Sequence, residues 1–251
     1  MEEVKATNLL DDEGWQLVVK AGRRRSATYG FLARLYRVEV DEEFLHELKE
    51  MRFPAKTGND LMDEGYRAIS AYLGKPLAGM ELELRIDYVR AFIGDGTDGT
   101  SAAYPFESVY TSEKHLRMQD ARDEVLAIYR SEGLNKCEDW HDDEDHLALE
   151  LEFMQFLCDK MADAVEANDE ARAFELLATQ NGFLNAHLCN WVPLMNDDMR
   201  KLAKTGLYKG LASLTEGYLE MEQELLEELV SDETEEDAEK PLAATDGGTH
   251  E

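Results

Sequence analysis

The sequence predicts an all-α protein, and three observations support that fold class. Apolar residues recur every three or four positions through most of the 251 residues, no long segment alternates with the period of two that marks a strand, and glycine or proline separates the periodic segments. With 43% hydrophobic residues, the chain can bury a core. We therefore expect a helical bundle.

The N-terminal half divides into four expected helices and a loop. Residues 1–13 are polar and expected to be flexible. Asp41 is placed to cap the second helix, while Gly74 and Pro76 end the third. The helices are expected at about Glu13–Val38, from Asp41 through Leu48, at Asp60–Leu73 and at Glu81–Ile93.

The segment Gly94–Tyr110 is rich in glycine and contains a proline, so it is expected to be a loop. Its glycines do not match the phosphate-binding pattern GxxxxGK[ST], because no lysine follows. Tyr104, Phe106 and Tyr110 make it more aromatic than a passive linker. Ser112 is then placed to cap a helix to about Glu132.

The stretch Asp142–Met154, DDEDHLALELEFM, places four acids and a histidine at the start of a predicted helix that then becomes apolar on two faces. Such a helix is typically central in a bundle, with its polar start at a loop. The polar connector before it makes residues 133–145 a candidate hinge. Two helical halves that meet near 133–142 remain an alternative to a single domain over 14–230.

The C-terminal part predicts three more helices and a tail. Pro193 is expected to break the first of them, and residues 231–251 lack aromatics and are acidic, so they are expected to be disordered. The helices are expected at Asp169–Trp191, Met195–Lys204 and Leu207–Val230.

Composition narrows the class of function. The chain has 55 acidic and 26 basic residues, a formal net charge of −29, which disfavours nucleic acid and anionic membranes and attracts cationic partners. Three widely spaced cysteines without a CxxC pair predict neither a disulfide framework nor a zinc site and fit the reduced cytoplasm. No apolar run approaches the ~18 residues of a membrane span.

Arg23-Arg24-Arg25-Ser26 superficially resembles a twin-arginine export signal. Arg34 and Arg37 interrupt the segment that would have to be apolar, so we interpret it as an amphipathic first helix.

Catalytic and metal motifs are incomplete. Ser108 and His146 could belong to a hydrolase triad, but there is no GxSxG turn. Asp143 and His146 form one DxxH without the second copy that a di-metal bundle needs, and HExxH is absent. A capped helix start with a solvated histidine is the simpler interpretation. Carboxylates beside an apolar groove would instead suit a basic, apolar peptide.

Three blocks of residues resemble the TorD/DmsD/NarJ-type redox-enzyme maturation chaperones, over roughly residues 26–230. They are Tyr88–Gly94 with Tyr104–Tyr110, Glu144–Leu147 with Glu150–Met154, and His187–Leu188 with Trp191–Leu194. One departure is that Asp143-Glu144 stand where the family often has a proline before the acid-histidine pair.

The resemblance implies a cytoplasmic, non-enzymatic helical chaperone, monomeric or homodimeric. Its partner would be the catalytic subunit of a molybdopterin oxidoreductase, often bound at a twin-arginine signal peptide until the cofactor is inserted. No cofactor of its own is implied, and weak guanine-nucleotide binding is an expectation from the family only. The rivals are a NarJ-like assembly factor whose client lacks an export signal, and a metal- or nucleotide-dependent hydrolase.

The resemblance also implies a peptide site at the hinge. Asp145 and His146 would lie at its loop. The partner's arginines would meet the acids of this region. The candidate site residues are Tyr104, Pro105, Glu107, Ser108, Tyr110, Asp142, Asp143, Asp145 and His146.

Overall fold

The computed structural model describes residues 12–94, 102–137 and 139–239, and this part of the chain is helical without a β-strand. The all-α prediction is confirmed. The helices are α1 (Asp12–Arg37), α2 (Glu42–Glu50), α3 (Asp60–Leu73), α4 (Met80–Tyr88), α5 (Glu107–Thr111), α6 (Asp120–Ser131), α7 (Leu147–Glu166), α8 (Glu170–Phe183), α9 (Val192–Leu202) and α10 (Gly206–Glu239), with π-helical turns η1 (Val89–Ile93) and η2 (Leu184–Leu188).

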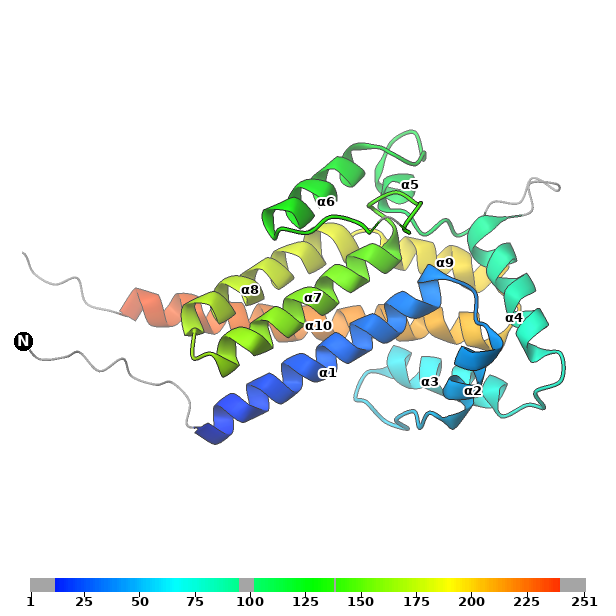
Figure 1. Cartoon of the computed structure of the whole chain (residues 1–251), viewed down its shortest axis with the longest axis horizontal. Helices are drawn as coiled ribbons and strands as arrows, with labels where there is room; N and C mark the ends of the chain where they lie inside the picture. The colour runs from blue at the N-terminus through cyan, green and yellow to red at the C-terminus, as the bar shows by residue number, and fades with distance from the viewer. Residues whose placement is uncertain (1–11, 95–101, 138, 240–251) are drawn as a thin grey trace, which may run out of the picture.

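Helices α1, α7, α8 and α10 form the body of the molecule (Figure 1). Helix α1 packs along α7, α8 packs against both α7 and α10, and α3 packs along α10. Helices α2, α3 and α4 gather at one end, while α5 and α6 lie across the start of α7. The start of α7 is therefore where the loop after η1 meets the connector 132–146.

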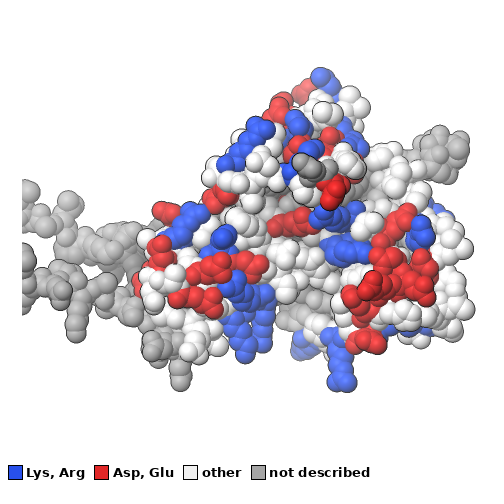
Figure 2. All heavy atoms as spheres, viewed as in Figure 1, with Lys and Arg blue, Asp and Glu red and all other residues white. Residues whose placement is uncertain are grey.

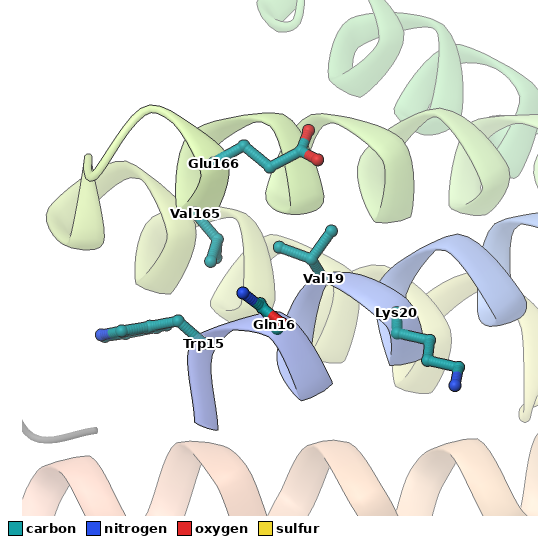
Figure 3. Close-up of a pocket in the computed structure, with 6 residues that line it drawn as sticks. All are labelled: Trp15, Gln16, Val19, Lys20, Val165 and Glu166. Atoms are coloured by element: carbon teal, nitrogen blue, oxygen red, sulfur yellow. The ribbon is translucent and has the colours of Figure 1, made fainter. Parts of the chain in front are cut away.

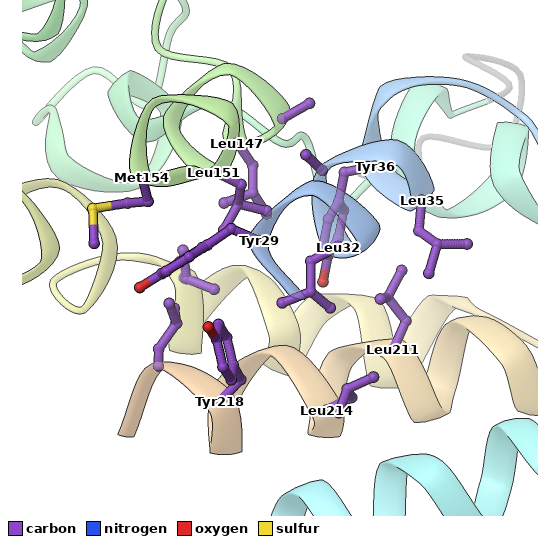
Figure 4. Packing of buried hydrophobic residues seen from close by; sticks show 14 of the residues in the cluster. Tyr29, Leu32, Leu35, Tyr36, Leu147, Leu151, Met154, Leu211, Leu214 and Tyr218 are labelled. Atoms are coloured by element: carbon purple, nitrogen blue, oxygen red, sulfur yellow. The ribbon is translucent and has the colours of Figure 1, made fainter. Parts of the chain in front are cut away.

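The core lies where α1, α7 and α10 face one another (Figure 4). Tyr29 of α1 and Tyr218 of α10 meet edge to face with ring centroids 5.0 Å apart, and both rings are buried. The Tyr36 hydroxyl is 2.9 Å from the Thr215 hydroxyl. Leu147 and the residues that follow it on α7 cover the third side, as a central apolar helix requires.

Two arginines of α1 form ion pairs with neighbouring helices, and one of these pairs is buried. Arg25 and Glu222 form a buried ion pair between α1 and α10, with a shortest N–O distance of 2.8 Å. Arg23 donates to Asp159 and Asp163 of α7 at 3.0 and 2.6 Å. The arginines that resemble an export signal thus belong to an amphipathic helix of the fold.

The prediction of one helix from Ser112 to Glu132 was wrong. Helix α5 ends at Thr111, Ser112 follows it, and α6 starts only at Asp120. His115 and Met118 between them have φ values of 51° and 59°, which a right-handed helix cannot contain.

The helix expected at Asp169–Trp191 does end before Pro193, with its last turn at Leu188, but the next helix starts at Val192 and not at Met195, so Pro193 lies in the first turn of α9. Its missing N–H has no helical acceptor there in any case. Helix α10 continues past Val230 to Glu239. The rest of the expected tail, most of the expected flexible N-terminus and part of the expected glycine loop lie outside the described residues.

No helix in the described part of the chain combines the length and the apolar character needed to cross a membrane.

Candidate peptide-binding site

The aromatic loop and the start of α7 lie against each other as two short antiparallel segments. The Leu147 amide donates to the Pro105 carbonyl at 2.9 Å, and the Glu107 amide donates to the Asp145 carbonyl at 3.0 Å. Phe106 and His146 form the bridge between them. Residues that are about 40 positions apart in the sequence therefore form one cluster, to which these contacts bring the predicted site residues Pro105, Glu107, Asp145 and His146.

Asp145 is fully buried and caps a neighbouring helix. Its Oδ2 accepts from the Ser108 amide at 2.9 Å, in the first turn of α5. Burial raises the pKa of Asp145, and the hydrogen bonds from Ser108 oppose that rise. No described residue donates to its Oδ1. In this conformation Asp145 holds α5 in place and does not face a partner.

His146 is the N-cap of α7, where its Nδ1 accepts from the Ala148 amide at 3.0 Å. An accepting Nδ1 means a neutral ring with its proton on Nε2. The rings of Phe106 and Trp140 meet it edge to face at 4.9 and 5.1 Å. Burial lowers the pKa of His146 to about 4. The expected cap is present, but the expectation of a solvated histidine was wrong.

Glu107 is buried and already bound. Its Oε2 lies 3.0 Å from His187 Nδ1, and its Oε1 accepts from Asn190 at 3.3 Å. The network continues through His187, because Trp191 Nε1 donates to the His187 carbonyl at 2.6 Å and to Glu150 at 3.2 Å. Burial raises the pKa of Glu150, and the charge of Glu107 raises it further. This polar network, which the sequence reasoning missed, joins the aromatic loop to α7 and η2.

Tyr104 and Tyr110, the two tyrosines of the predicted site, make different contacts. Tyr110 is half-buried and stacks on Trp191, with centroids 5.7 Å apart, and burial raises its pKa. Tyr104 is also half-buried, and its carbonyl accepts from the Phe106 amide at 2.9 Å. Tyr110 thus supports the site from within, as packing of a loop onto a core requires.

Asp142 and Asp143 are the acids of the cluster that reach the surface, with side chains 52% and 14% exposed. Arg117 donates to Asp142 Oδ1 at 2.9 Å and to Asp143 Oδ2 at 2.7 Å. Its guanidinium also lies 3.9 Å from the centroid of the Phe106 ring. The sequence reasoning missed Arg117 because it placed this residue on a helix.

The described contacts do not form a hydrolytic pair. The Ser108 hydroxyl accepts from the Gln119 amide at 3.1 Å, while His146 Nδ1 is used by Ala148. Among the described residues, no three His, Cys, Asp or Glu side chains are arranged to hold a metal ion.

An apolar hollow of about 270 Å³ lies beside the start of α7, under residues 134–137. Tyr129, Leu134, Leu149, Phe153 and Phe156 form its floor and walls. Arg37, Asn135, Lys136, Cys137 and Glu152 contribute its polar lining. Lys136, which lines the hollow, donates to the Asp142 carbonyl at 3.0 Å, so the hollow and the acidic surface are neighbours.

A second hollow, of about 240 Å³, lies between the start of α1 and the end of α7 (Figure 3). Trp15 and Val19 line it from α1, and Val165 and Glu166 line it from α7. Since a helix rises 1.5 Å per residue, this end of α7 is roughly 30 Å from its start. The second hollow is therefore remote from the candidate site.

Figure 2 shows how charge is distributed on one face of the molecule. Acidic and basic side chains alternate over α6, α7 and α1, and a larger acidic patch covers α2 and the adjacent part of α4. Exposed Asp41, Glu42 and Glu43 belong to α2 and its cap. The acidic excess is thus not confined to the candidate site.

Fold and site together define a class of protein: a helical bundle in which an aromatic loop is held against a helix start that carries an acid and a histidine. Residues 59–197, which include every candidate site residue, match the model of the nitrate reductase delta subunit family. The chain belongs to this family, and the resemblance to TorD/NarJ-type proteins is confirmed.

Several relatives bear the name chaperone protein TorD. That of Vibrio cholerae serotype O1 is 27% identical over 155 residues, which cover 61% of this chain and 66% of the relative. That of Photobacterium profundum is 22% identical over 84% of this chain and 98% of the relative. That of Vibrio parahaemolyticus is 24% identical over 90% and 99%. The chain therefore spans slightly less than two thirds of the Vibrio cholerae protein and nearly all of the other two.

Proposed function

We propose that this protein is a cytoplasmic maturation chaperone that binds the catalytic subunit of a molybdopterin oxidoreductase, at its twin-arginine signal peptide, until the cofactor is inserted. The observation that carries the proposal is the position of two surface acids, Asp142 and Asp143, beside an apolar hollow. Relatives named as chaperones that align with most of the chain support the general class.

The surface acids and the hollow bind different parts of the signal peptide. Arginines of the signal peptide bind Asp142 and Asp143, since carboxylates accept guanidinium groups in a bidentate manner. The apolar part of the peptide enters the hollow lined by Phe153 and Phe156. Glu107 and Asp145 are buried and support the site indirectly, since Glu107 holds the loop to His187 and Asn190 and Asp145 accepts from the Ser108 amide. The peptide is released unchanged, so no chemical step is needed.

Apolar burial supplies most of the affinity and charge supplies selectivity. An exposed ion pair contributes up to about 1 kcal/mol, whereas apolar contact contributes about 25 cal/mol for each Å² removed from water. Two arginines alone would therefore bind weakly. A peptide with arginines but without an apolar stretch is rejected, and so is an apolar peptide without arginines.

Calorimetry with a synthetic peptide that contains two adjacent arginines and an apolar stretch tests this proposal. Because Arg117 already pairs with both acids, the test is made in proteins that carry Arg117→Ala. In that background, Asp142→Asn with Asp143→Asn removes up to two ion pairs with the peptide and is expected to raise Kd by about threefold to thirtyfold. Asp123→Asn is the matched control, because Asp123 is an exposed acid paired with Arg122 on α6. If Asp142→Asn with Asp143→Asn leaves Kd in the Arg117→Ala background unchanged, these acids are not the peptide site.

A second candidate is supported by the description of the family model, nitrate reductase delta subunit. It is an assembly factor of the NarJ kind, whose client lacks an export signal. Purification of the protein with its bound subunit from the native cell separates the two. A client that starts with two arginines and an apolar stretch favours the first proposal, and a client without them favours the second.

A further inference from the structure

The segment 112–119 brings an arginine of the chain itself onto the proposed peptide site. Arg117 contacts Asp142 and Asp143 through two different nitrogens and lies over the Phe106 ring. A guanidinium group in this position makes the two kinds of contact that suit it best, charged hydrogen bonds and an aromatic face. The two acids of the site are thus already paired with a guanidinium group, which is the group expected of the ligand.

The two residues that flank Arg117 are apolar, as the ligand is expected to be beside its arginines. Leu116 and Met118 flank Arg117 and are 56% and 62% exposed, so neither side chain is held by burial. His115 and Met118 have positive φ values, a conformation that side chains disfavour. The exposed apolar side chains and the positive φ values do not stabilise the segment 112–119 in this position. The contacts of Arg117 with Asp142, Asp143 and Phe106 therefore help to hold it there.

Few other contacts fix the segment. The Gln119 amide donates to the Ser108 hydroxyl, and His115 Nδ1 lies 2.9 Å from the Val109 carbonyl. The side chain of Arg117 is 44% exposed, so its ion pairs are in contact with water and can exchange. One guanidinium can replace another on the same acids at little net cost, since both form charged hydrogen bonds of the same kind.

We infer that Arg117 is an internal stand-in for the arginine of the client, and that the client must displace it to bind. This inference rests on the proposed function and adds a mode of regulation to the same site. A peptide with charge alone only exchanges one arginine for another and gains nothing. A peptide that also fills the apolar hollow displaces the segment, so the stand-in makes the site more selective.

The stand-in lowers the apparent affinity, because only the open form binds. If the segment is closed about 70–90% of the time, the apparent Kd is raised by ~3- to 10-fold over that of an open site. A variant in which Arg117 binds Asp142 and Asp143 less tightly should therefore show an apparent Kd that is lower by up to this factor.

The variant Arg117→Lys tests the inference without a change in charge. Lysine lacks the planar fork that binds two carboxylates and stacks on a ring. The peptide with two arginines and an apolar stretch is therefore expected to bind the variant ~3- to 10-fold more tightly in calorimetry. Arg122→Lys is the control, because Arg122 pairs with Glu144 and Asp123 on the same side of the molecule and should leave Kd unchanged. Equal or weaker binding by Arg117→Lys would overturn the inference.

Amide hydrogen exchange of the wild-type protein supplies a second, independent measurement. Binding of the peptide is expected to increase exchange in 112–119 as Arg117 leaves the acids, although binding normally protects a site. Unchanged or reduced exchange in this segment would overturn the inference alone, provided that the peptide binds. A wild-type protein that binds no such peptide would overturn the proposed function and this inference together.

Discussion

Asp145 and His146 are adjacent residues that stabilise the starts of two different helices. Asp145 accepts from the Ser108 amide in α5, and His146 accepts from the Ala148 amide in α7. The first amides of a helix have no internal acceptor, and leaving one unpaired in a buried place is costly. This pair therefore fixes the aromatic loop against α7.

Burial of His146 predicts that stability falls in mild acid. Its pKa is about 4 in the folded protein and 6.5 ordinarily, so between these values the unfolded chain binds more protons and the free energy of unfolding falls as pH falls. The full difference corresponds to about 3 kcal/mol. Asp145 and Glu150 have raised pKa values and act in the opposite direction. The histidine contribution is therefore best measured as a difference between variants.

His146→Asn isolates that contribution, because asparagine is a good N-cap and does not titrate. Urea unfolding of both proteins at pH 7.5 and 4.5 is expected to show that the wild type loses about 2–3 kcal/mol more than the variant. Equal losses in the two proteins would show that His146 is not held neutral by burial.

The sequence predicts which residues gather in the site, but not which of them reach solvent. Pro105, Glu107 and Asp145 were expected near one another from the family resemblance, and they lie together. Their burial depends on how the loop packs onto α7 and η2, and a local pattern of acids does not contain that information. An acid at a helix start normally indicates a solvated cap, and here the packing of distant segments overrides it.

Helices α3 and α10 approach each other closely, and glycines permit that approach. A Cβ on Gly65 would lie 2.6 Å from the Gly210 carbonyl oxygen and 2.6 Å from the Leu214 amide nitrogen. These are backbone atoms of α10, which cannot move without moving the helix. The small residues therefore set the distance between the two helices.

Gly65→Ala is expected to destabilise the protein by about 1–3 kcal/mol, since the added methyl group overpacks this crossing. Gly182→Ala is the matched control in α8, where an added Cβ meets no atom within 4 Å. The control should be stabilised by roughly 0.5–1 kcal/mol, because alanine favours a helix. Thermal or urea unfolding checks both signs, and a Gly65→Ala protein as stable as the wild type would show that the crossing is loose.

Helix boundaries follow the sequence where a cap and a stop signal enclose a periodic run. Residues Asp60–Leu73 form the predicted helix, with Gly74 at its end. The prediction fails for 112–119, whose apolar residues Leu116 and Met118 remain exposed. The shape of that segment depends on Asp142, Asp143 and Phe106, which lie elsewhere in the sequence.

The charge of the whole molecule acts on stability and on binding with opposite signs. A formal net charge of −29 makes the folded protein repel itself. The same charge attracts a cationic peptide. Salt screens both effects, and the Debye length falls from about 30 Å at 0.01 M to about 10 Å at 0.1 M.

Raising NaCl from about 0.01 M to about 0.1 M is therefore expected to raise Tm and to raise the Kd of the arginine-containing peptide in the same range. For a chain of this size, each kcal/mol gained in stability shifts Tm by about 2–4 °C. Scanning calorimetry and titration calorimetry on one preparation measure the two effects together. A peptide with lysine in place of arginine should show a similar salt dependence with weaker binding, because Asp142 and Asp143 then lose the bidentate geometry but keep the charge. If salt left Kd unchanged while Tm rose, the acidic excess would serve the solubility of the chain and the peptide would bind through its apolar part alone.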